Sequence, residues 1–82
     1  LFDASETGRL DHVIIVMNKG ADIHVFNDYA VRMASENGHL EVVEYLITQG
    51  ANIHADNDYA VRGASQYGHL KVVEYPNLNK ET

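Results

Sequence analysis

The chain is poor in several residue types, and each shortage excludes a class of protein. Its 82 residues contain no cysteine, no tryptophan and a single proline. The lack of cysteine excludes a disulfide framework, a thiolate nucleophile and a cysteine-based zinc site. No apolar run approaches the roughly 18–20 residues that span a bilayer. The opening residues lack the basic and apolar regions of a signal peptide. We therefore expect an intracellular location and no membrane partner.

Basic residues are also scarce. Six Lys and Arg residues stand against twelve Asp and Glu residues, which gives a net charge of −6. Because an acidic surface is repelled by phosphate groups, we expect no nucleic-acid partner and no attraction to an anionic membrane. The hydrophobic content of 45% is that of an ordinary globular chain, so the composition predicts a folded protein.

The dominant feature of the sequence is an internal repeat. Residues 20–49 and residues 50–79 align without gaps and are identical at 19 of 30 positions. Residues 1–19 fit the later part of the same unit, since Gly8 aligns with Gly38. A tandem repeat of this length predicts stacked units, each of which buries its apolar face against its neighbours.

Each unit is predicted to contain two short helices and a loop. Asp28 and Asp58 are expected to be the N-caps of the first helices, and Gly38 and Gly68 to end them in the left-handed conformation. The second helix is expected to begin at His39 and to carry an apolar stripe, formed by Leu40, Val43, Leu46 and Ile47. Residues 20–28 have β-branched side chains and little helical periodicity, so they predict an extended loop or a hairpin-like finger.

Two blocks of the second unit form a specific pattern: residues 34–43 read ASENGHLEVV and residues 46–53 read LITQGANI. Both blocks resemble ankyrin repeats, of a short-finger variety with a 30-residue period. The resemblance implies an all-α, ankyrin-type solenoid of three helix-turn-helix units linked by two short β-hairpin-like fingers. It also implies a non-enzymatic scaffold that binds protein or peptide partners on the concave face of the fingers and first helices. No cofactor is implied.

The sequence departs from the family pattern in two places. The unit is 30 residues long instead of 33, which predicts a shorter finger. Tyr29-Ala30-Val31-Arg32 stands where the family has T-P-L-H, and the same four residues recur at 59–62. The hydrogen bonding of the family's Thr and His at that turn is therefore absent, and Asp28 and Asp58 are expected to replace it.

The predicted domain organisation is a repeat array over residues 1–76, with units at 1–19, 20–49 and 50–76, followed by a polar tail at 77–82. Pro76 is expected to end the last helix near Tyr75. Ile14 and Ile15 stand where the second unit has Glu44 and Tyr45, so the outer face of the first unit is expected to be apolar. We expect the chain to be a monomer or a fragment of a longer array.

Positions that differ between two nearly identical units are free of the shared structural demand, so they are candidates for partner binding. Phe26 and Met33 are expected to form an exposed apolar patch with Tyr67, because aromatic anchors often dominate binding energy. Acidic neighbours favour a partner with a basic segment. The predicted partner-binding residues are Val25, Phe26, Met33, Glu36, Asn37, Asp56, Gln66 and Tyr67.

The repeated polar residues are expected to be structural. Tyr29 and Tyr59 should pack between units with their hydroxyls in water. Equivalent histidines of adjacent units should be too far apart to share a zinc ion, because packed helices lie about 8–10 Å apart. Ser35 and its equivalents occupy a small-residue packing position, and no catalytic motif is present. We therefore expect neither a metal site nor an enzyme.

Three alternatives to a partner-binding module stay open on the sequence. The segment is a structural spacer within a longer array, or it belongs to a regulatory subunit or inhibitor that docks on an enzyme. The third alternative is another helical repeat, such as a tetratricopeptide array, against which the period and the G-A-[DN]-I block both argue.

Overall fold

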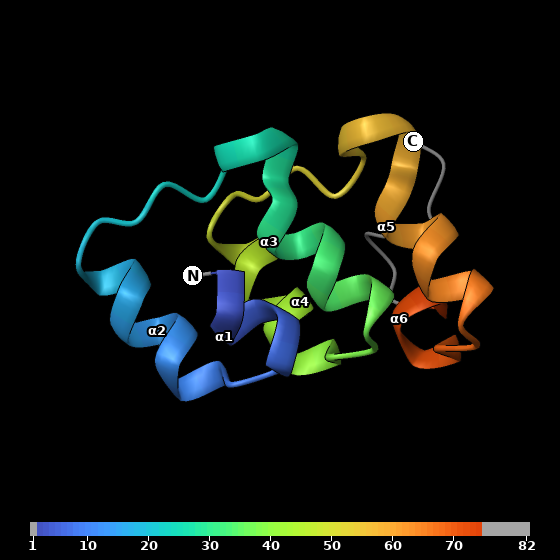
Figure 1. The fold of residues 1–82 in the computed structure, drawn as a ribbon, viewed down its shortest axis with the longest axis horizontal. Helices are drawn as coiled ribbons and strands as arrows, with labels where there is room; N and C mark the ends of the chain where they lie inside the picture. Colours follow the sequence, from blue (N-terminus) through green and yellow to red (C-terminus); the bar gives the residue numbers. More distant parts are fainter. Residues whose placement is uncertain (1, 75–82) are drawn as a thin grey trace.

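The computed structural model describes residues 2–74, and side chains from Ala4 onward. Within that range the chain forms six helices and no strand (Figure 1). Their bounds in chain order are α1 Phe2–Thr7, α2 Leu10–Asn18, α3 Val25–Glu36, α4 Leu40–Thr48, α5 Ala55–Gln66 and α6 Leu70–Glu74. No helix in the described part of the chain has the length and apolarity needed to cross a membrane.

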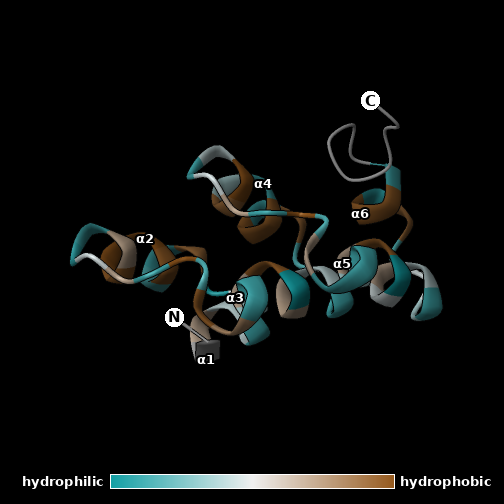
Figure 2. Ribbon diagram, turned by 90° about the horizontal axis from the view of Figure 1, so that it is seen from above, coloured by the Kyte–Doolittle hydropathy of each residue, from teal (hydrophilic) through white to brown (hydrophobic). Residues whose placement is uncertain are grey.

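The helices form two layers. The first helices of the three units, α1, α3 and α5, lie side by side in one row, and α2, α4 and α6 form the other (Figure 2). Helix α3 contacts both α1 and α5, whereas α4 contacts α2 and α6. Each helix therefore packs against the equivalent helix of the neighbouring unit, as the repeat predicts.

Glycine ends the first helix of each unit, as predicted. Gly38 has φ +78°, and the next residue, His39, donates its backbone N–H to the carbonyl oxygen of Ala34 at 2.9 Å. This is the hydrogen bond of a glycine-terminated helix, in which the turn satisfies a carbonyl group that the helix leaves free. The equivalent bond joins His69 to Ala64, also at 2.9 Å.

The core lies between the two layers and is built from small and β-branched side chains. The two full units share Val31, Ala34, Val42 and Val43, which predicts these positions in the core, and all four are 0% exposed. Leu46 is the largest fully buried side chain. Leu40, also predicted in the core, is only partly buried.

The predicted hairpin-like finger is not present in the described residues. Ile23 and Ile53, where strand character was expected, lie in turns and are 8% and 6% exposed. After each of them the chain makes a left-handed turn, which opens α3 and α5. This turn leaves no residues for the second arm of a hairpin.

The predicted N-caps are also wrong. Asp28 and Asp58 have φ 59°, whereas an N-cap residue has φ and ψ in the β region. Their carboxylates accept hydrogen bonds from other parts of the chain, as described below. Two further predictions, the end of the last helix at Pro76 and the polar tail at 77–82, concern positions outside the described residues.

Candidate functional site

A left-handed turn opens the first helix of the second and third units. Phe26, Asn27 and Asp28 have φ between 55° and 59° and ψ between 43° and 52°. Asp56, Asn57 and Asp58 repeat the same conformation in α5. Left-handed helical conformation costs roughly 1–2 kcal/mol per residue for most L-amino acids, and Asn and Asp tolerate it best. Three consecutive residues in this region therefore require specific stabilisation.

An arginine supplies that stabilisation. The Arg32 guanidinium donates from Nε to the Asn27 carbonyl oxygen and from Nη2 to the Phe26 carbonyl oxygen, each at 2.9 Å. In the third unit Arg62 makes the same two bonds, to the carbonyl oxygens of Asn57 and Asp56 at 2.9 and 3.1 Å. These bonds satisfy backbone carbonyl groups that, in a left-handed turn, cannot accept the backbone hydrogen bonds of a right-handed helix.

A histidine and an aspartate hold the other side of the turn. His24 donates from Nδ1 to the Asp28 carboxylate at 3.0 Å, and the backbone N–H of Asn52 donates to the same carboxylate at 2.6 Å. The Asp28 residue is 4% exposed, and these two donors compensate for the burial of its charge. Since Asn52 belongs to the next unit, the carboxylate also links two units.

Phe26 is the residue that fits this turn least well. Its equivalent in the third unit is Asp56, a residue type that tolerates the left-handed region. Phe26 is also 70% exposed. A large apolar side chain thus stands in solvent on a backbone conformation that disfavours it.

Two tyrosines link the first helices of adjacent units. The Tyr29 hydroxyl donates to the Glu6 carboxylate at 2.6 Å, and the Tyr59 hydroxyl donates to that of Glu36 at 2.7 Å. The sequence did not predict these carboxylate acceptors. The hydrogen bond to the carboxylate raises the pKa of both tyrosines above 10.0, and desolvation by burial and the charge of the same glutamate add to this.

Arginine and tyrosine side chains alternate along the row of first helices. The Arg32 guanidinium carbon lies 5.5 Å from the ring centroid of Tyr29 and 5.1 Å from that of Tyr59. Arg62 lies 5.5 Å from the ring of Tyr59. All three distances are within cation–π range, so Arg32, which stabilises the turn, also links two units.

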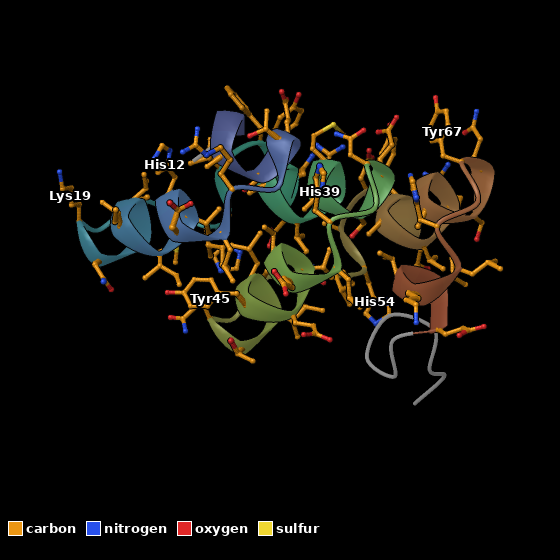
Figure 3. All side chains as sticks on the ribbon, turned by 90° about the horizontal axis from the view of Figure 1, so that it is seen from below. His12, Lys19, His39, Tyr45, His54 and Tyr67 are labelled. Carbon is orange, nitrogen blue, oxygen red and sulfur yellow. The ribbon has the colours of Figure 1, made fainter. Side chains whose placement is uncertain are left out.

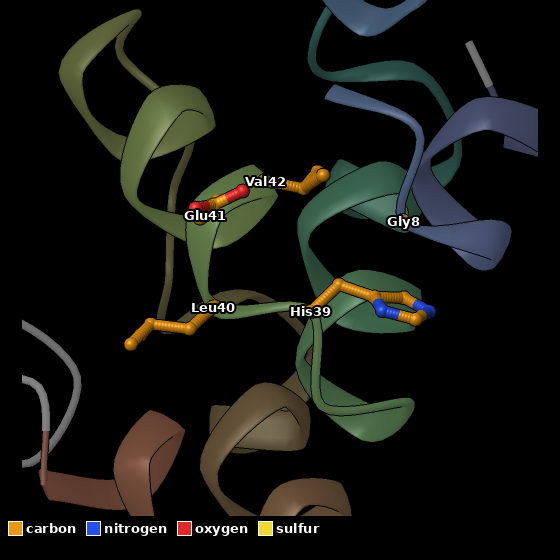
Figure 4. A pocket seen from close by; sticks show the side chains of 5 residues that line it. All are labelled: Gly8, His39, Leu40, Glu41 and Val42. Atoms are coloured by element: carbon orange, nitrogen blue, oxygen red, sulfur yellow. The ribbon is translucent and has the colours of Figure 1, made fainter. Parts of the chain in front are cut away.

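His39 occupies the junction between the first two units. Its Nε2 donates to the Glu6 carbonyl oxygen at 2.9 Å, and its ring lies over Gly8, where an added Cβ would be 2.4 Å from Nδ1. Figure 4 shows the ring beside Gly8, at the edge of an open groove lined also by Leu40, Glu41 and Val42. His39 lies in the turn between the two helices of its own unit, as predicted, and its side chain also joins two units.

The predicted partner-binding residues lie toward both ends of the first helices. Phe26 lies in the turn that opens α3, whereas Tyr67 follows the last residue of α5. The right-handed part of α3 runs for eight residues, from Tyr29 to Glu36, and is about 12 Å long. This length separates the turn at the start of each first helix from the residues at its other end. Tyr67 lies at the end of the molecule opposite Lys19 (Figure 3).

The other predicted residues lie along the first helices, from the turns at their start to the residues at their opposite end. Val25 lies beside Phe26 and is half-buried. Asp56 is the equivalent of Phe26 in the next unit, and its carboxylate lies 3.6 Å from Nη1 of Arg32. Met33 is partly buried in the middle of α3. The remaining three, at the far end, are Glu36, bonded to Tyr59, Asn37, whose amide donates to the Glu6 carbonyl oxygen at 3.2 Å, and the exposed Gln66.

Sequence reasoning missed the side chains that build the turn and the junctions. They are Arg32, Glu6, His24 and their equivalents. Glu6 lies 23 and 33 positions from its partners Tyr29 and His39, so no local pattern pairs them, whereas Arg32 and His24 bind groups 4 to 6 positions away through an unexpected backbone turn. The available signal was their exact recurrence, which indicates a shared structural role. No group of three or more His, Cys, Asp or Glu side chains suitable for a metal ion occurs among the described residues.

Comparison with known proteins agrees with the arrangement of helix pairs. No curated protein matches the chain. The family model described as ankyrin repeats in three copies matches residues 1–75. Ankyrin repeats are generally non-enzymatic, protein-interaction modules. With its helix pairs, its glycine-ended first helices and a family match over residues 1–75, this chain belongs to the ankyrin repeat family.

Proposed function

We propose that the chain binds a protein or peptide partner at the row of left-handed turns, with Phe26 as the apolar anchor. The observation that carries this proposal is the placement of Phe26. Its side chain is 70% exposed, and its backbone has φ 55°, in the left-handed region. Both features destabilise the free chain, whereas burial of the ring by a partner would recover roughly 25 cal/mol for each Å² of apolar surface removed from water.

The duplicated unit supports the same conclusion. At the equivalent position the third unit has Asp56, a polar residue that suits both the exposure and the left-handed backbone. The rest of the turn is the same in both units, including the clamping arginine. The aromatic residue is therefore not needed to make the turn, and backbone strain retained at an exposed position is typical of functional sites.

The chemistry beside Phe26 defines the partner. Asp56 lies in the adjacent turn with its side chain 50% exposed, and Asp58 in the same turn is 52% exposed. Adjacent helices in the row are expected to be about 8–10 Å apart. We infer a partner segment that places one apolar side chain on Phe26 and a basic side chain near Asp56 and Asp58, about one unit away. The acidic groups would raise the association rate more than the affinity.

The remaining predicted residues are proposed as the edge of this surface. Val25 borders Phe26. Met33 and Glu36 lie further along α3, toward the end of the helix that is opposite the turn. Asn37, Gln66 and Tyr67 lie at the opposite end, so a partner reaches them only if it runs along the helices. We further propose that the three units, 1–19, 20–49 and 50–76, form a segment of a solenoid that presents this row.

The test compares three versions of the chain as bait for affinity capture with quantitative mass spectrometry. They are the unchanged chain, Phe26→Asn, and Ile15→Asn as a matched control. Ile15 is also an exposed apolar side chain, at 51%, but it lies on α2 in the other layer. A protein captured by the unchanged chain and by Ile15→Asn, but lost with Phe26→Asn, supports the proposal.

The captured protein is then purified and titrated against each variant and against Asp56→Asn. We expect Phe26→Asn to weaken binding at least tenfold, and Asp56→Asn to weaken it less and to reduce its dependence on salt. Equal capture by all three baits would overturn the Phe26 surface and would favour a structural spacer. A captured enzyme whose activity falls on binding would identify the docking inhibitor among the alternatives.

A further inference from the structure

The first helix of every unit is followed by a glycine with φ between 76° and 78°. These glycines are Gly8, Gly38 and Gly68. The residue before the glycine differs between units: it is Thr7 in the first, Asn37 in the second and Tyr67 in the third. Only the second unit therefore places a side-chain amide directly before this glycine.

An asparagine that precedes a glycine can lose its side-chain amide. The backbone nitrogen of the glycine attacks Cγ of the asparagine, and the new C–N bond closes a five-membered imide. The bond from Cγ to Nδ2 breaks, and Nδ2 leaves as ammonia with the proton of the glycine N–H. Water then opens the ring at either carbonyl group and leaves aspartate or isoaspartate. Glycine favours this reaction because it has no side chain to hinder the attacking nitrogen.

The fold requires a glycine after Asn37. A Cβ on Gly38 would lie 2.4 Å from Nδ1 of His69, and the φ of +78° strains any L side chain. The nitrogen that follows Asn37 is therefore unhindered for a structural reason. Asn37 is itself exposed, so water has access to an imide formed there.

The local backbone of the folded chain keeps the reacting atoms apart. Asn37 has ψ 2°, so the nitrogen of Gly38 lies on the side of the main-chain nitrogen of Asn37 and away from its side chain. The N–H of Gly38 also donates to the carbonyl oxygen of Ser35 at 3.1 Å. Attack on Cγ requires the peptide group between Asn37 and Gly38 to rotate, and this rotation breaks the bond to Ser35.

Contacts with the first unit hold this peptide group in place. The Asn37 amide donates to the carbonyl oxygen of Glu6 at 3.2 Å, and His39 donates to the same oxygen from Nε2 at 2.9 Å. The His39 ring also lies over Gly8. Residues on both sides of Gly38 are thus bonded to the first unit, and the rotation requires the junction between the first two units to open.

We propose that Asn37 is a deamidation site, protected while the first unit is packed on the second and reactive when that junction opens. The carboxylate that replaces the amide cannot donate to the Glu6 carbonyl oxygen and places a negative charge beside it. Isoaspartate also adds a methylene group to the main chain in the turn that ends α3. Each product weakens the junction that protected the site, so the modification is an irreversible record of opening. It is independent of partner binding at Phe26.

The experiment incubates the full chain at 37 °C and pH 8 and follows each asparagine by mass spectrometry of its peptides. The same incubation in denaturing urea gives the rate in the unfolded chain. Asn52 is the internal control, since it is also exposed but is followed by the β-branched Ile53. We expect Asn37 to react at least roughly tenfold more slowly in the folded chain than in urea. In urea, Asn52 should react much more slowly than Asn37.

Two matched variants locate the opening. Tyr29→Phe removes the bond to the Glu6 carboxylate at the first junction, and Tyr59→Phe removes the equivalent bond to Glu36 at the second. We expect Tyr29→Phe to accelerate deamidation of Asn37 in the folded chain roughly tenfold, and Tyr59→Phe to accelerate it much less. Both variants should keep the rate of the unchanged chain in urea.

The effect of the modification is measured with Asn37→Asp, which has the charge of the product. We expect it to lower the melting temperature by about 4–8 °C. Asn37→Gln is the control, because it keeps an amide donor and would have to close a less favourable six-membered ring. It should lower the melting temperature less and stay unmodified during the incubation.

Three results would overturn the proposal. Equal rates for Asn37 in the folded chain and in urea would mean that the fold gives no protection. Equal acceleration by Tyr29→Phe and Tyr59→Phe would assign the reaction to unfolding of the whole chain. A melting temperature that Asn37→Asp leaves unchanged would mean that the product does not weaken the junction.

Discussion

The Arg32 guanidinium donates through Nε to the carbonyl oxygen of Asn27 at 2.9 Å, and this bond closes a turn of the wrong hand for L-amino acids. The same side chain packs between Tyr29 and Tyr59. One residue therefore stabilises the local conformation of the turn and the junction between two units. This double role explains why the arginine and tyrosine recur together in the sequence.

Replacement of Arg32 should separate the two units as well as open the turn. We expect Arg32→Ala to lower the free energy of unfolding by about 2 kcal/mol, because it removes two hydrogen bonds from a charged donor that is largely buried. Arg62→Ala should cost less, since Arg62 is exposed and has one ring partner. Urea unfolding of both variants measures the difference. Equal losses would show that the second ring contributes nothing.

Exchange of the residues at the tips of the two turns should change stability in opposite directions. Phe26→Asn should raise the free energy of unfolding by roughly 1 kcal/mol, because asparagine tolerates the left-handed region better than phenylalanine. Asp56→Phe should lower it, since it introduces the same strain and removes the carboxylate near Arg32. If Phe26→Asn destabilises the chain in urea unfolding, the ring has a structural role and is not kept for a partner.

The tyrosine–glutamate bonds should make the chain sensitive to alkaline pH. The pKa of Tyr29 and of Tyr59 is raised in the folded chain above the ordinary value of 10.0. A raised pKa means that the folded state keeps the phenol proton more tightly than the unfolded state. This stabilisation is complete below pH 10 and is lost as the pH rises through the folded-state pKa.

Absorbance at 295 nm, followed from pH 8 to pH 12, reports this ionisation directly. We expect the chain with both Tyr29→Phe and Tyr59→Phe to lose the late-titrating signal and to show a flatter fall of melting temperature above pH 10. Tyr67→Phe is the control, since Tyr67 is 56% exposed. Late titration that survives in the double variant would place it on other tyrosines.

Two buried hydroxyl groups should be dispensable for stability. Ser35 is 0% exposed and its Oγ has no hydrogen-bond partner, as is also true of Ser5. Removal of a buried, unsatisfied polar group is neutral or stabilising, so Ser35→Ala should change the free energy of unfolding by less than about 1 kcal/mol, in the stabilising direction. Leu46→Ala, in contrast, should cost about 2–5 kcal/mol. A large loss with Ser35→Ala would reveal a hydrogen bond made in solution.

Local sequence features predicted the helices well because helix formation and termination depend on nearby residues. Gly38 ends α3 because the turn needs a residue with positive φ, which glycine adopts without strain. The hydrogen bond that closes this turn joins His39 to Ala34, so all the residues involved lie close together in the sequence. Val31 and Val43 are buried because their spacing puts them on the faces that the repeat must cover. The prediction of Leu40 as a core residue was less accurate, since Leu40 is only partly buried.

The turns were predicted poorly for a physical reason. β-Branched residues near Ile23 favour extended structure, but the conformation is decided by Arg32, which reaches back to the carbonyl oxygens of Phe26 and Asn27. The positions of Phe26 and Tyr67 toward opposite ends of the first helices were not predictable either. Equivalent positions do not reveal that the first helix separates its two ends by about 12 Å.

The sequence by itself determined that the chain consists of helix pairs of the ankyrin repeat family, which of its glycines end the first helices, and that Val31 and Val43 are buried. These properties follow from residue type and short-range spacing. Only the tertiary structure decided that the turns are left-handed and that Tyr29 meets Glu6 and His39 covers Gly8. Such contacts join side chains that are 23 or more positions apart. They exist only once neighbouring units have packed together.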